Sequence, residues 1–320
     1  MKRRWIELKL FPYHWLLIPA VVVFMFLVQA VSPPRVFSAS GRSESFSLRV
    51  DGRTREVIMH LPAAYDPRSS YPLLIFLHGA GGSGRQAMEQ TNLVRTADQG
   101  GFLACFPDGT GADEGKLTWN AWNCCGYANA HKVDDVKFLT ALIERLQRMY
   151  SVDGNRLFLA GFSNGAMMGY RFAVEGRIPL TGLAAVAGNL VCPKPCPKPG
   201  PVAVLIIHGT ADKVVLYNGK PTPARVGDEA AEDSVRYAVD FWTRHNGCSG
   251  PPEVRKEGRV DYERWAGRSP GQAVALYSLR DAGHAWPGGA KKRYQYCDLP
   301  TDDLAASEAI WRFFQGLSKS

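Results

Sequence analysis

One serine lies in a turn that is typical of nucleophilic catalysis. Ser163 stands in the pentapeptide Gly161-Phe-Ser-Asn-Gly165, between the apolar residues 157–160 and a stretch of helical composition. Strand, Gly-x-Ser-x-Gly and helix together form a nucleophile elbow, in which the glycines allow a sharp turn and the serine hydroxyl is lifted onto its tip. The backbone N–H of Asn164, at the start of the predicted helix, points the same way and is expected to help bind an oxyanion.

A nucleophilic serine needs a histidine base and an acid that orients it, and in this type of sheet the order along the chain is Ser, Asp, His. His284 lies in a loop just past a predicted strand, whereas His245 lies toward the end of a predicted helix, where capping or a solvated position is the simpler explanation. Asp212 follows the strand predicted at 202–207, at the same edge of the sheet. We therefore predict a catalytic triad of Ser163, Asp212 and His284.

A second turn carries glycines in the spacing G-x-G-x-x-G: Gly79, Gly81 and Gly84. This spacing between a strand and a helix is the dinucleotide fingerprint, and Asp108 stands near the expected place of a ribose-binding acid. Alternatively, the turn directs the N–H of Ala80 toward Asn164 and completes an oxyanion hole. The oxyanion interpretation is favoured, because a hairpin precedes this turn, whereas the dinucleotide motif normally uses the first strand of its unit.

Short apolar strands alternate with helical stretches along the rest of the chain. Residues 45–50 and 53–61 alternate around Asp51-Gly52 and predict a hairpin. Buried strands are predicted at 72–78, 102–106, 157–160, 183–187, 202–207 and 274–278, and helices at 83–98, 136–150, 234–246 and 303–317. This pattern predicts an α/β protein with a mostly parallel central sheet and helices on both faces, in one domain over 45–320. Its functional loops are expected at the carboxyl ends of the strands.

The first thirty residues differ from the body of the chain. Four basic residues precede residues 15–28, which carry no charge and are shorter than a full membrane span. A small-x-small site ends at Ala30, so we predict a signal peptide over 1–30, followed by a linker over 31–44. An uncleaved anchor over 15–31 is the alternative. Either interpretation predicts export to the periplasm or the extracellular space.

The charge and the cysteines narrow the choice of partners and compartment. Of the net charge of +8, residues 1–30 hold +3, and no basic run with interleaved aromatic residues is present, so no nucleic-acid partner is predicted. Seven cysteines fit an oxidising compartment. Cys105 lies in an apolar strand and is expected to be a buried free thiol.

The other six cysteines lie in predicted loops: Cys124, Cys125, Cys192, Cys196, Cys248 and Cys297. They allow up to three disulfides and fifteen pairings, of which a local closure between Cys192 and Cys196 is one. Zinc is a competing interpretation for Cys124 and Cys125 near His131. No paired C-x-x-C spacing supports it, so no metal site is predicted.

Several blocks occur in a family-like order: His78-Gly-Ala-Gly-Gly82, Phe106-Pro-Asp-Gly109, Trp119-Asn-Ala-Trp-Asn-Cys-Cys-Gly126, Val133-Asp-Asp-Val136, Tyr150-Ser-Val-Asp-Gly-Asn-Arg156, the elbow at 161–168, His208-Gly-Thr-Ala-Asp212 and Gly283-His-Ala-Trp-Pro-Gly288. Together they resemble the α/β-hydrolase family of secreted polyhydroxybutyrate depolymerases and feruloyl or acetylxylan esterases, over about residues 45–317. The resemblance implies the same triad, no cofactor, and Trp286 near the acyl pocket. Asn164 departs from the family pattern, because a smaller residue often stands there.

The predicted function is that of an exported serine esterase, acting on feruloyl or acetyl esters or on 3-hydroxybutyrate oligomers or polyester. Trp119 and Trp122 could join Trp286 in an aromatic wall for the substrate, although packing is an equal explanation for the first two. The segments 213–233 and 254–272 have no family counterpart, so the resemblance does not identify which ester is the substrate. Two other classes remain as alternatives: a dinucleotide-dependent oxidoreductase using the turn with Gly79, and a non-catalytic envelope binding protein of the same fold.

Overall fold

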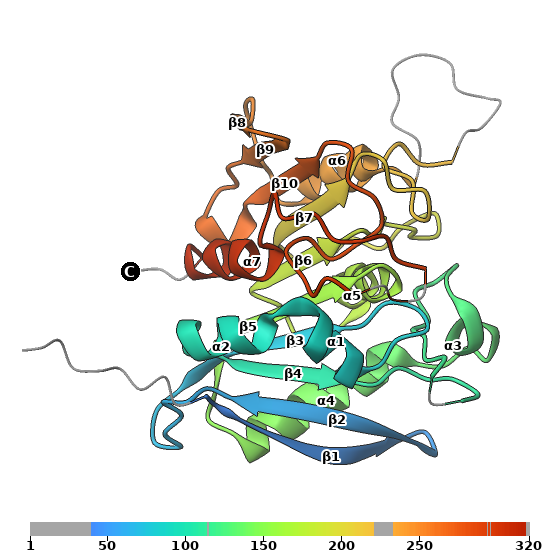
Figure 1. Cartoon of the computed structure of the whole chain (residues 1–320), viewed down its shortest axis with the longest axis vertical. Helices are drawn as coiled ribbons and strands as arrows, with labels where there is room; N and C mark the ends of the chain where they lie inside the picture. Colours follow the sequence, from blue (N-terminus) through green and yellow to red (C-terminus); the bar gives the residue numbers. More distant parts are fainter. Residues whose placement is uncertain (1–39, 114, 221–232, 293, 295, 318–320) are drawn as a thin grey trace, which may run out of the picture. The chain divides into compact units, whose positions relative to one another are not determined.

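A single ten-stranded sheet organises the residues described by the computed structural model, which are 40–113, 115–220, 233–292, 294 and 296–317. The strand order is β1-β2-β4-β3-β5-β6-β7-β10-β9-β8 (Figure 1). The strands are β1 (Arg42–Val50), β2 (Arg53–Leu61), β3 (Tyr71–Leu77), β4 (Leu103–Pro107), β5 (Val152–Phe162), β6 (Gly182–Val186), β7 (Ala203–Gly209), β8 (Glu253–Glu257), β9 (Val260–Trp265) and β10 (Val274–Leu279). The central strands from β4 to β10 pair in parallel, and an antiparallel pair flanks them at each edge.

Helices cover both faces of this sheet (Figure 1). The helices α1 (Gly84–Thr91), α2 (Leu93–Gly100) and α7 (Ala306–Gln315) contribute to one apolar cluster, and α4 (Asp135–Met149), α5 (Asn164–Glu175) and α6 (Val235–His245) to the other. The short helix α3 (Gly126–Ala130) lies in the connection after β4, and a 3₁₀ turn spans Pro270–Gln272. In β3, Leu73 and Ile75 join the α4 side while Leu74 and Phe76 join the α1 side. Burial on both faces explains why the central strands read as continuous apolar runs.

The predicted mostly parallel sheet with helices on both faces is confirmed, and so is the opening hairpin. The helix predicted at 83–98 is instead two helices, because Asn92 between them has a left-handed backbone with φ 57°. The segment 254–272, in which no strand was predicted, contains β9 and all but the first residue of β8. Most residues of these strands are charged and, apart from buried Val260, all are partly or fully exposed, so the strands lack the apolar pattern by which strands are recognised.

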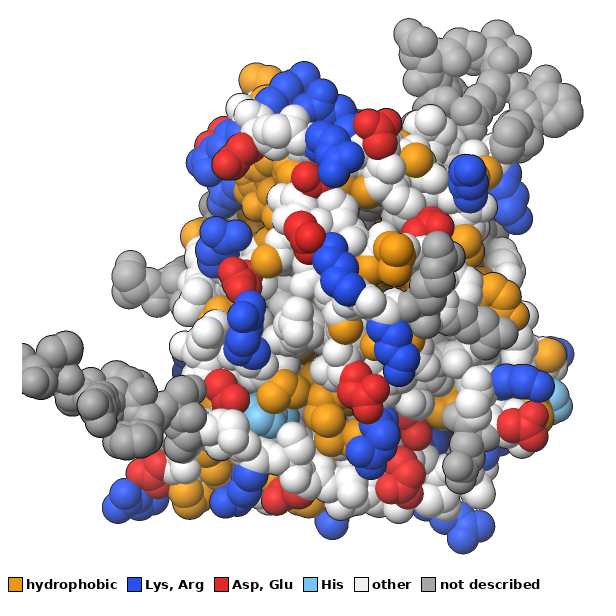
Figure 2. Space-filling view, in the orientation of Figure 1, with side chains coloured by type: hydrophobic (Ala, Val, Ile, Leu, Met, Phe, Trp, Pro, Cys, Tyr) orange, Lys and Arg blue, Asp and Glu red, His pale blue; other side chains and the backbone are white. Residues whose placement is uncertain are grey.

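The segments at the predicted boundaries are described only in part. The described strand β1 begins at Arg42, so the end of the predicted 31–44 linker belongs to the sheet. The predicted leader, 1–30, lies outside the described residues, as do residues 221–232 of the predicted 213–233 excursion. Among the residues that are described, no helix is long and apolar enough to cross a membrane. On the face drawn in Figure 2, acidic and basic side chains are interspersed.

Candidate active site

Ser163 sits at the turn between β5 and α5, with φ 53° and ψ −120°. A positive φ is costly for a residue with a side chain, and such strain commonly marks functional turns. A Cβ added to Gly161 would lie 2.4 Å from the carbonyl carbon of Gly165, and one on Gly165 would lie 2.2 Å from the Leu77 oxygen. Strand and helix therefore approach so closely that both elbow positions require glycine.

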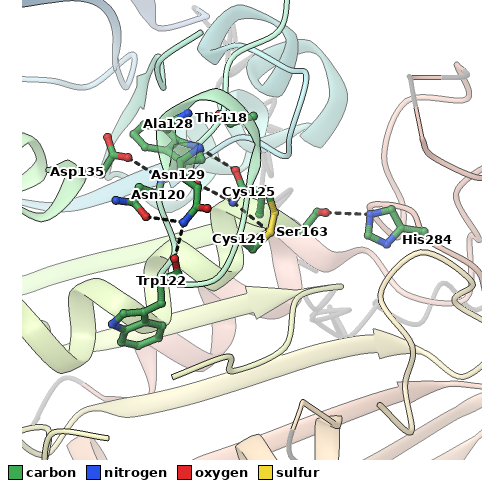
Figure 3. The surroundings of a disulfide bond; sticks show 12 residues. Thr118, Asn120, Trp122, Cys124, Cys125, Ala128, Asn129, Asp135, Ser163 and His284 are labelled. Carbon is green, nitrogen blue, oxygen red and sulfur yellow. Dashed lines mark hydrogen bonds between the residues drawn. A yellow bond between two sulfur atoms is a disulfide. The ribbon is translucent and has the colours of Figure 1, made fainter. Parts of the chain in front are cut away.

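The structure brings the three residues of the predicted triad together. His284 Nε2 lies 3.0 Å from Ser163 Oγ (Figure 3), and His284 Nδ1 lies 2.7 Å from Asp212 Oδ2. Ser163 follows β5, Asp212 follows β7 and His284 follows β10, so all three lie at the carboxyl edge of the sheet. Asp212 and His284 are 3% and 2% exposed, which keeps their hydrogen bond away from water.

The Asp212 carboxylate lies against four polar groups. Its Oδ1 accepts the N–H groups of Val214 and Val215, each at 2.8 Å. Its Oδ2 accepts from His284 and also lies 3.3 Å from His208 Nε2. Burial by itself raises the pKa of Asp212, but the hydrogen bonds from His208 and His284 outweigh it and hold this pKa below its usual range. The carboxylate is therefore ready to stabilise a charged imidazolium.

The two predicted oxyanion donors, Ala80 and Asn164, flank the serine. Ala80 lies in the turn after β3, and Asn164 is the first residue of α5. A Cβ on Gly79 would lie 3.5 Å from Ser163 Cβ, so this turn passes directly beside the serine. Within the described part of the chain, neither the Ala80 nor the Asn164 backbone N–H donates a hydrogen bond to a protein acceptor. Both donors are thus available to a developing negative charge.

His78 fixes the turn that carries Ala80. Its Nε2 accepts the N–H of Gly109 at 2.9 Å, so the ring proton is on Nδ1, which donates to the Gly79 oxygen at 2.8 Å. Burial lowers the pKa of His78 to about 4. The neutral imidazole therefore ties the turn after β3 to the loop after β4.

The same turn does not fit the dinucleotide interpretation. Asp108 Oδ1 accepts the N–H of Gly84 at 2.7 Å, so a carboxylate already occupies the start of α1, where a pyrophosphate would have to bind. A Cβ on Gly84 would lie 2.3 Å from the Phe106 oxygen. Close packing against β4 accounts for this glycine without a cofactor.

The predicted aromatic wall is not the arrangement found. Trp119 is fully buried, donates from Nε1 to the His78 oxygen at 3.0 Å and packs on Phe138. Trp286 is 1% exposed and packs edge-on against Phe76, with ring centroids 5.1 Å apart. Both tryptophans are core residues, because the loops that carry them turn these side chains inward. Trp122 is partly exposed and remains a proposed substrate contact.

Two positioning contacts were missed from the sequence. Asp298 Oδ2 accepts the N–H of His284 and the Asp298 N–H donates to the His284 oxygen, both at 2.8 Å. The Asn164 side chain pairs with the backbone of Trp119, accepting its N–H at 2.8 Å and donating to its oxygen at 3.0 Å. The second contact explains why a larger side chain stands in this elbow. Neither contact has a local sequence signal, since the partners lie 14 and 45 residues apart.

The cysteines fall into three groups. Cys192 and Cys196 form the local disulfide considered above, and the adjacent Cys124 and Cys125 are also joined. Cys105 is a buried free thiol, as predicted. Cys248 and Cys297, counted as disulfide candidates, carry free thiols instead.

The fold and the hydrogen-bonded Ser, His and Asp side chains define an α/β-hydrolase. The family described as "Phospholipase/Carboxylesterase" matches residues 65–226. The protein named "Putative esterase NocK" from Nocardia uniformis subsp. tsuyamanensis is 31% identical over 75% of this chain and 73% of its own length. Feruloyl esterase B from Piromyces equi is 28% identical, over 72% of this chain and 42% of its own.

Solved structures agree with the fold. An acetyl xylan esterase from Aspergillus awamori matches with a TM-score of 0.55 at 12% identity, covering 76% of this chain and 94% of that one.

The chain belongs to the phospholipase/carboxylesterase family of α/β-hydrolases and is a carboxylic ester hydrolase. The predicted esterase family is thereby confirmed, and nothing in these similarities favours an oxidoreductase or a non-catalytic binding protein.

Proposed function

We propose that this chain is an exported serine esterase that cleaves feruloyl or acetyl esters through an acyl-enzyme. The continuous hydrogen-bonded series from Asp212 through His284 to Ser163 carries the proposal. Relatives named feruloyl esterase and bifunctional acetylxylan esterase/xylanase support the choice of esters. Esters of 3-hydroxybutyrate remain the second candidate, and the composition of residues 1–30 supports export.

In the proposed reaction, Ser163 Oγ attacks the ester carbonyl carbon while its proton passes to His284 Nε2. The carbonyl oxygen becomes an oxyanion that accepts the N–H groups of Ala80 and Asn164. The imidazolium, stabilised by Asp212, then gives its proton to the departing alcohol and leaves an acyl-serine. Water repeats these steps, releases the acid and restores the serine. Every proton is transferred between the substrate, water and the side chains of Ser163 and His284.

The test compares wild type, Ser163→Ala and Ser45→Ala on p-nitrophenyl acetate, methyl ferulate and 3-hydroxybutyrate oligomers. Ser45 is an exposed serine of β1 and serves as the control. We expect Ser163→Ala to lose about 10⁴-fold or more in kcat with the fold intact, because removing one triad member disables the whole unit. An organophosphate should label wild type and Ser45→Ala but not Ser163→Ala. Unchanged activity of the Ser163→Ala variant would overturn the proposal.

A further inference from the structure

The side chain of Asn164 reaches away from the elbow into the loop that follows β4. Its Nδ2 donates to the Trp119 oxygen at 3.0 Å and to Cys124 Sγ at 3.8 Å, while its Oδ1 accepts the Trp119 N–H at 2.8 Å. Asn164 is 1% exposed, and these contacts use both of its amide protons. The residue whose N–H is proposed to bind the oxyanion is therefore oriented by this loop as well as by its helix.

The Cys124–Cys125 disulfide lies at the point where this loop meets the elbow. Figure 3 shows Ser163 between this disulfide and His284. The N–H of Cys125 donates to the Trp119 oxygen at 3.2 Å, the same oxygen that accepts from Asn164. The disulfide is thus linked to the Asn164 side chain twice, directly at Cys124 Sγ and through the Trp119 oxygen. Both cysteines are partly exposed, so a small reductant can reach them.

Hydrogen bonds to residues of α4 and α5 fix the rest of this loop. The N–H of Asn120 donates to buried Asp135 at 2.7 Å, and Arg171 donates to the Asn120 oxygen at 2.7 Å. Asp135 is also paired with buried Arg55, whose guanidinium lies over the Phe138 ring at 4.0 Å. Asn129 Nδ2 donates to Asn120 Oδ1 at 3.1 Å (Figure 3). These contacts hold one side of the loop, while the cysteine pair contacts Trp119 and Asn164 on the side that faces the elbow.

We infer that the oxidised Cys124–Cys125 pair is a positioning element for the oxyanion-binding residue Asn164, and that reducing this disulfide slows ester hydrolysis. The inference rests on the proposed function. A phosphine supplies two electrons and becomes a phosphine oxide with oxygen from water, while the S–S bond breaks and each sulfur takes one proton. Without the S–S bond, the turn that contacts Asn164 loses this covalent restraint.

Reduction of the disulfide is expected to change kcat rather than KM. An oxyanion donor acts mainly in the transition state, so its displacement lowers kcat and changes KM little. Removing such a donor completely costs about 10²–10³ in kcat in a comparable site. Displacing it should cost less, and we expect a fall of about 10- to 100-fold in kcat on reduction.

The Cys192–Cys196 disulfide provides a matched control, because within the described part of the chain no hydrogen bond joins either cysteine to the triad. The full chain, its Cys124→Ser/Cys125→Ser variant and its Cys192→Ser/Cys196→Ser variant are assayed with and without a phosphine. Mass spectrometry of alkylated peptides identifies the reduced cysteines, and circular dichroism follows the fold. Wild type and the Cys192→Ser/Cys196→Ser variant should lose kcat reversibly, whereas the Cys124→Ser/Cys125→Ser variant should be slow in both conditions.

Any of the following results would overturn the inference: free thiols at Cys124 and Cys125 in the untreated chain, unchanged kcat after their proven reduction, or loss of kcat only when Cys192–Cys196 is reduced. If the Cys124→Ser/Cys125→Ser variant fails to fold, reduction and reoxidation of the full chain decide alone. Failure of the phosphine to reduce the Cys124–Cys125 disulfide in the folded chain would also contradict the inference. Failure of the proposed function looks different, because the untreated wild type would then hydrolyse no ester and bind no organophosphate.

Discussion

Two imidazoles and two backbone N–H groups surround the Asp212 carboxylate. Burial raises the pKa of Asp212, but the two imidazoles outweigh it and lower this pKa, so the charged form is favoured in the folded chain and is lost only as the pH falls through that lowered value. Its favourable contribution to stability is fully present above the ordinary carboxyl range. An acid limit of activity at mildly acidic pH should therefore arise from groups other than Asp212.

His78 makes the stability of the fold depend on pH in the same direction as Asp212, although here the folded chain favours the neutral form. The folded chain holds this imidazole neutral with a pKa of about 4, whereas the unfolded chain binds a proton near the ordinary value of 6.5. The unfolded state therefore binds more protons as the pH falls, and the free energy of unfolding decreases. From pH 7.5 to pH 5, this one group should lower it by about 2 kcal/mol.

Urea unfolding of wild type, His78→Asn and His131→Asn at both pH values checks this expectation. His131 is exposed and serves as the control histidine. His78→Asn should lose the extra pH dependence while His131→Asn keeps it. Equal pH slopes in all three proteins would show that His78 is not its source.

At the scale of single residues, the sequence showed which residue types could act and where they lie along the chain. It could not show which way their side chains point. Ser163, Asp212 and His284 were predictable because the carboxyl ends of parallel strands converge at one sheet edge. The resemblance placed Trp286 near the acyl pocket, but a loop motif does not show which way its side chains point, and Trp286 is buried against Phe76. The second imidazole on Asp212 comes from His208, four residues earlier, and only the folded turn brings it within reach.

At the scale of elements, the junction of β5 and α5 sets the geometry of the nucleophile. β5 contains two glycines in very different surroundings, Gly161 beside the helix backbone and Gly154 near only the end of the Gln147 side chain, 3.7 Å away. Gly161→Ala would place its methyl group 2.4 Å from backbone atoms that cannot move independently. We expect this substitution to cost several kcal/mol of stability or to displace Ser163, and to remove activity.

Gly154→Ala adds the same methyl group to the same strand and should stay within about 0.5 kcal/mol of wild type, with full activity. Denaturation midpoints and kcat of the two purified variants provide the comparison. Equal behaviour of Gly161→Ala and Gly154→Ala would contradict the packing explanation of the elbow.

Strands and helices were predictable where burial produces a regular pattern of apolar residues. The central strands and the helices α4, α5 and α6 have such a pattern, since each buries apolar side chains against the sheet. The break at Asn92 depends on one left-handed residue, whereas β9 depends on pairing with β10, and β8 on pairing with β9. Pairing partners are fixed by the whole fold, so local composition did not reveal them.

At the scale of the whole molecule, two apolar clusters share one sheet. Leu73 belongs to the cluster on the α4 side and Leu74 to that on the α1 side, although they are neighbours in β3 and both fully buried. Leu73→Ala and Leu74→Ala should each lower the free energy of unfolding by about 2–5 kcal/mol. Because both faces depend on the same strands, each variant should still unfold in one transition.

Far-UV circular dichroism and tryptophan fluorescence check this expectation, since Trp242 and Trp286 lie in opposite clusters. Val254→Ala, in a strand position 53% exposed, is the control and should change stability little. Separate midpoints for the two probes would mean that the faces unfold independently.

The outermost strand β8 has a further consequence for the protein in concentrated solution. All five of its residues, Glu253-Val-Arg-Lys-Glu257, are exposed, and among the described strands it pairs on one side only, with β9. In Figure 2, charged side chains crowd over this end of the molecule. A strand from another chain could add to this edge only by crowding against four charged side chains, which opposes intermolecular sheet growth and aggregation. The charges that hid β8 from the sequence pattern also protect the open edge of the sheet.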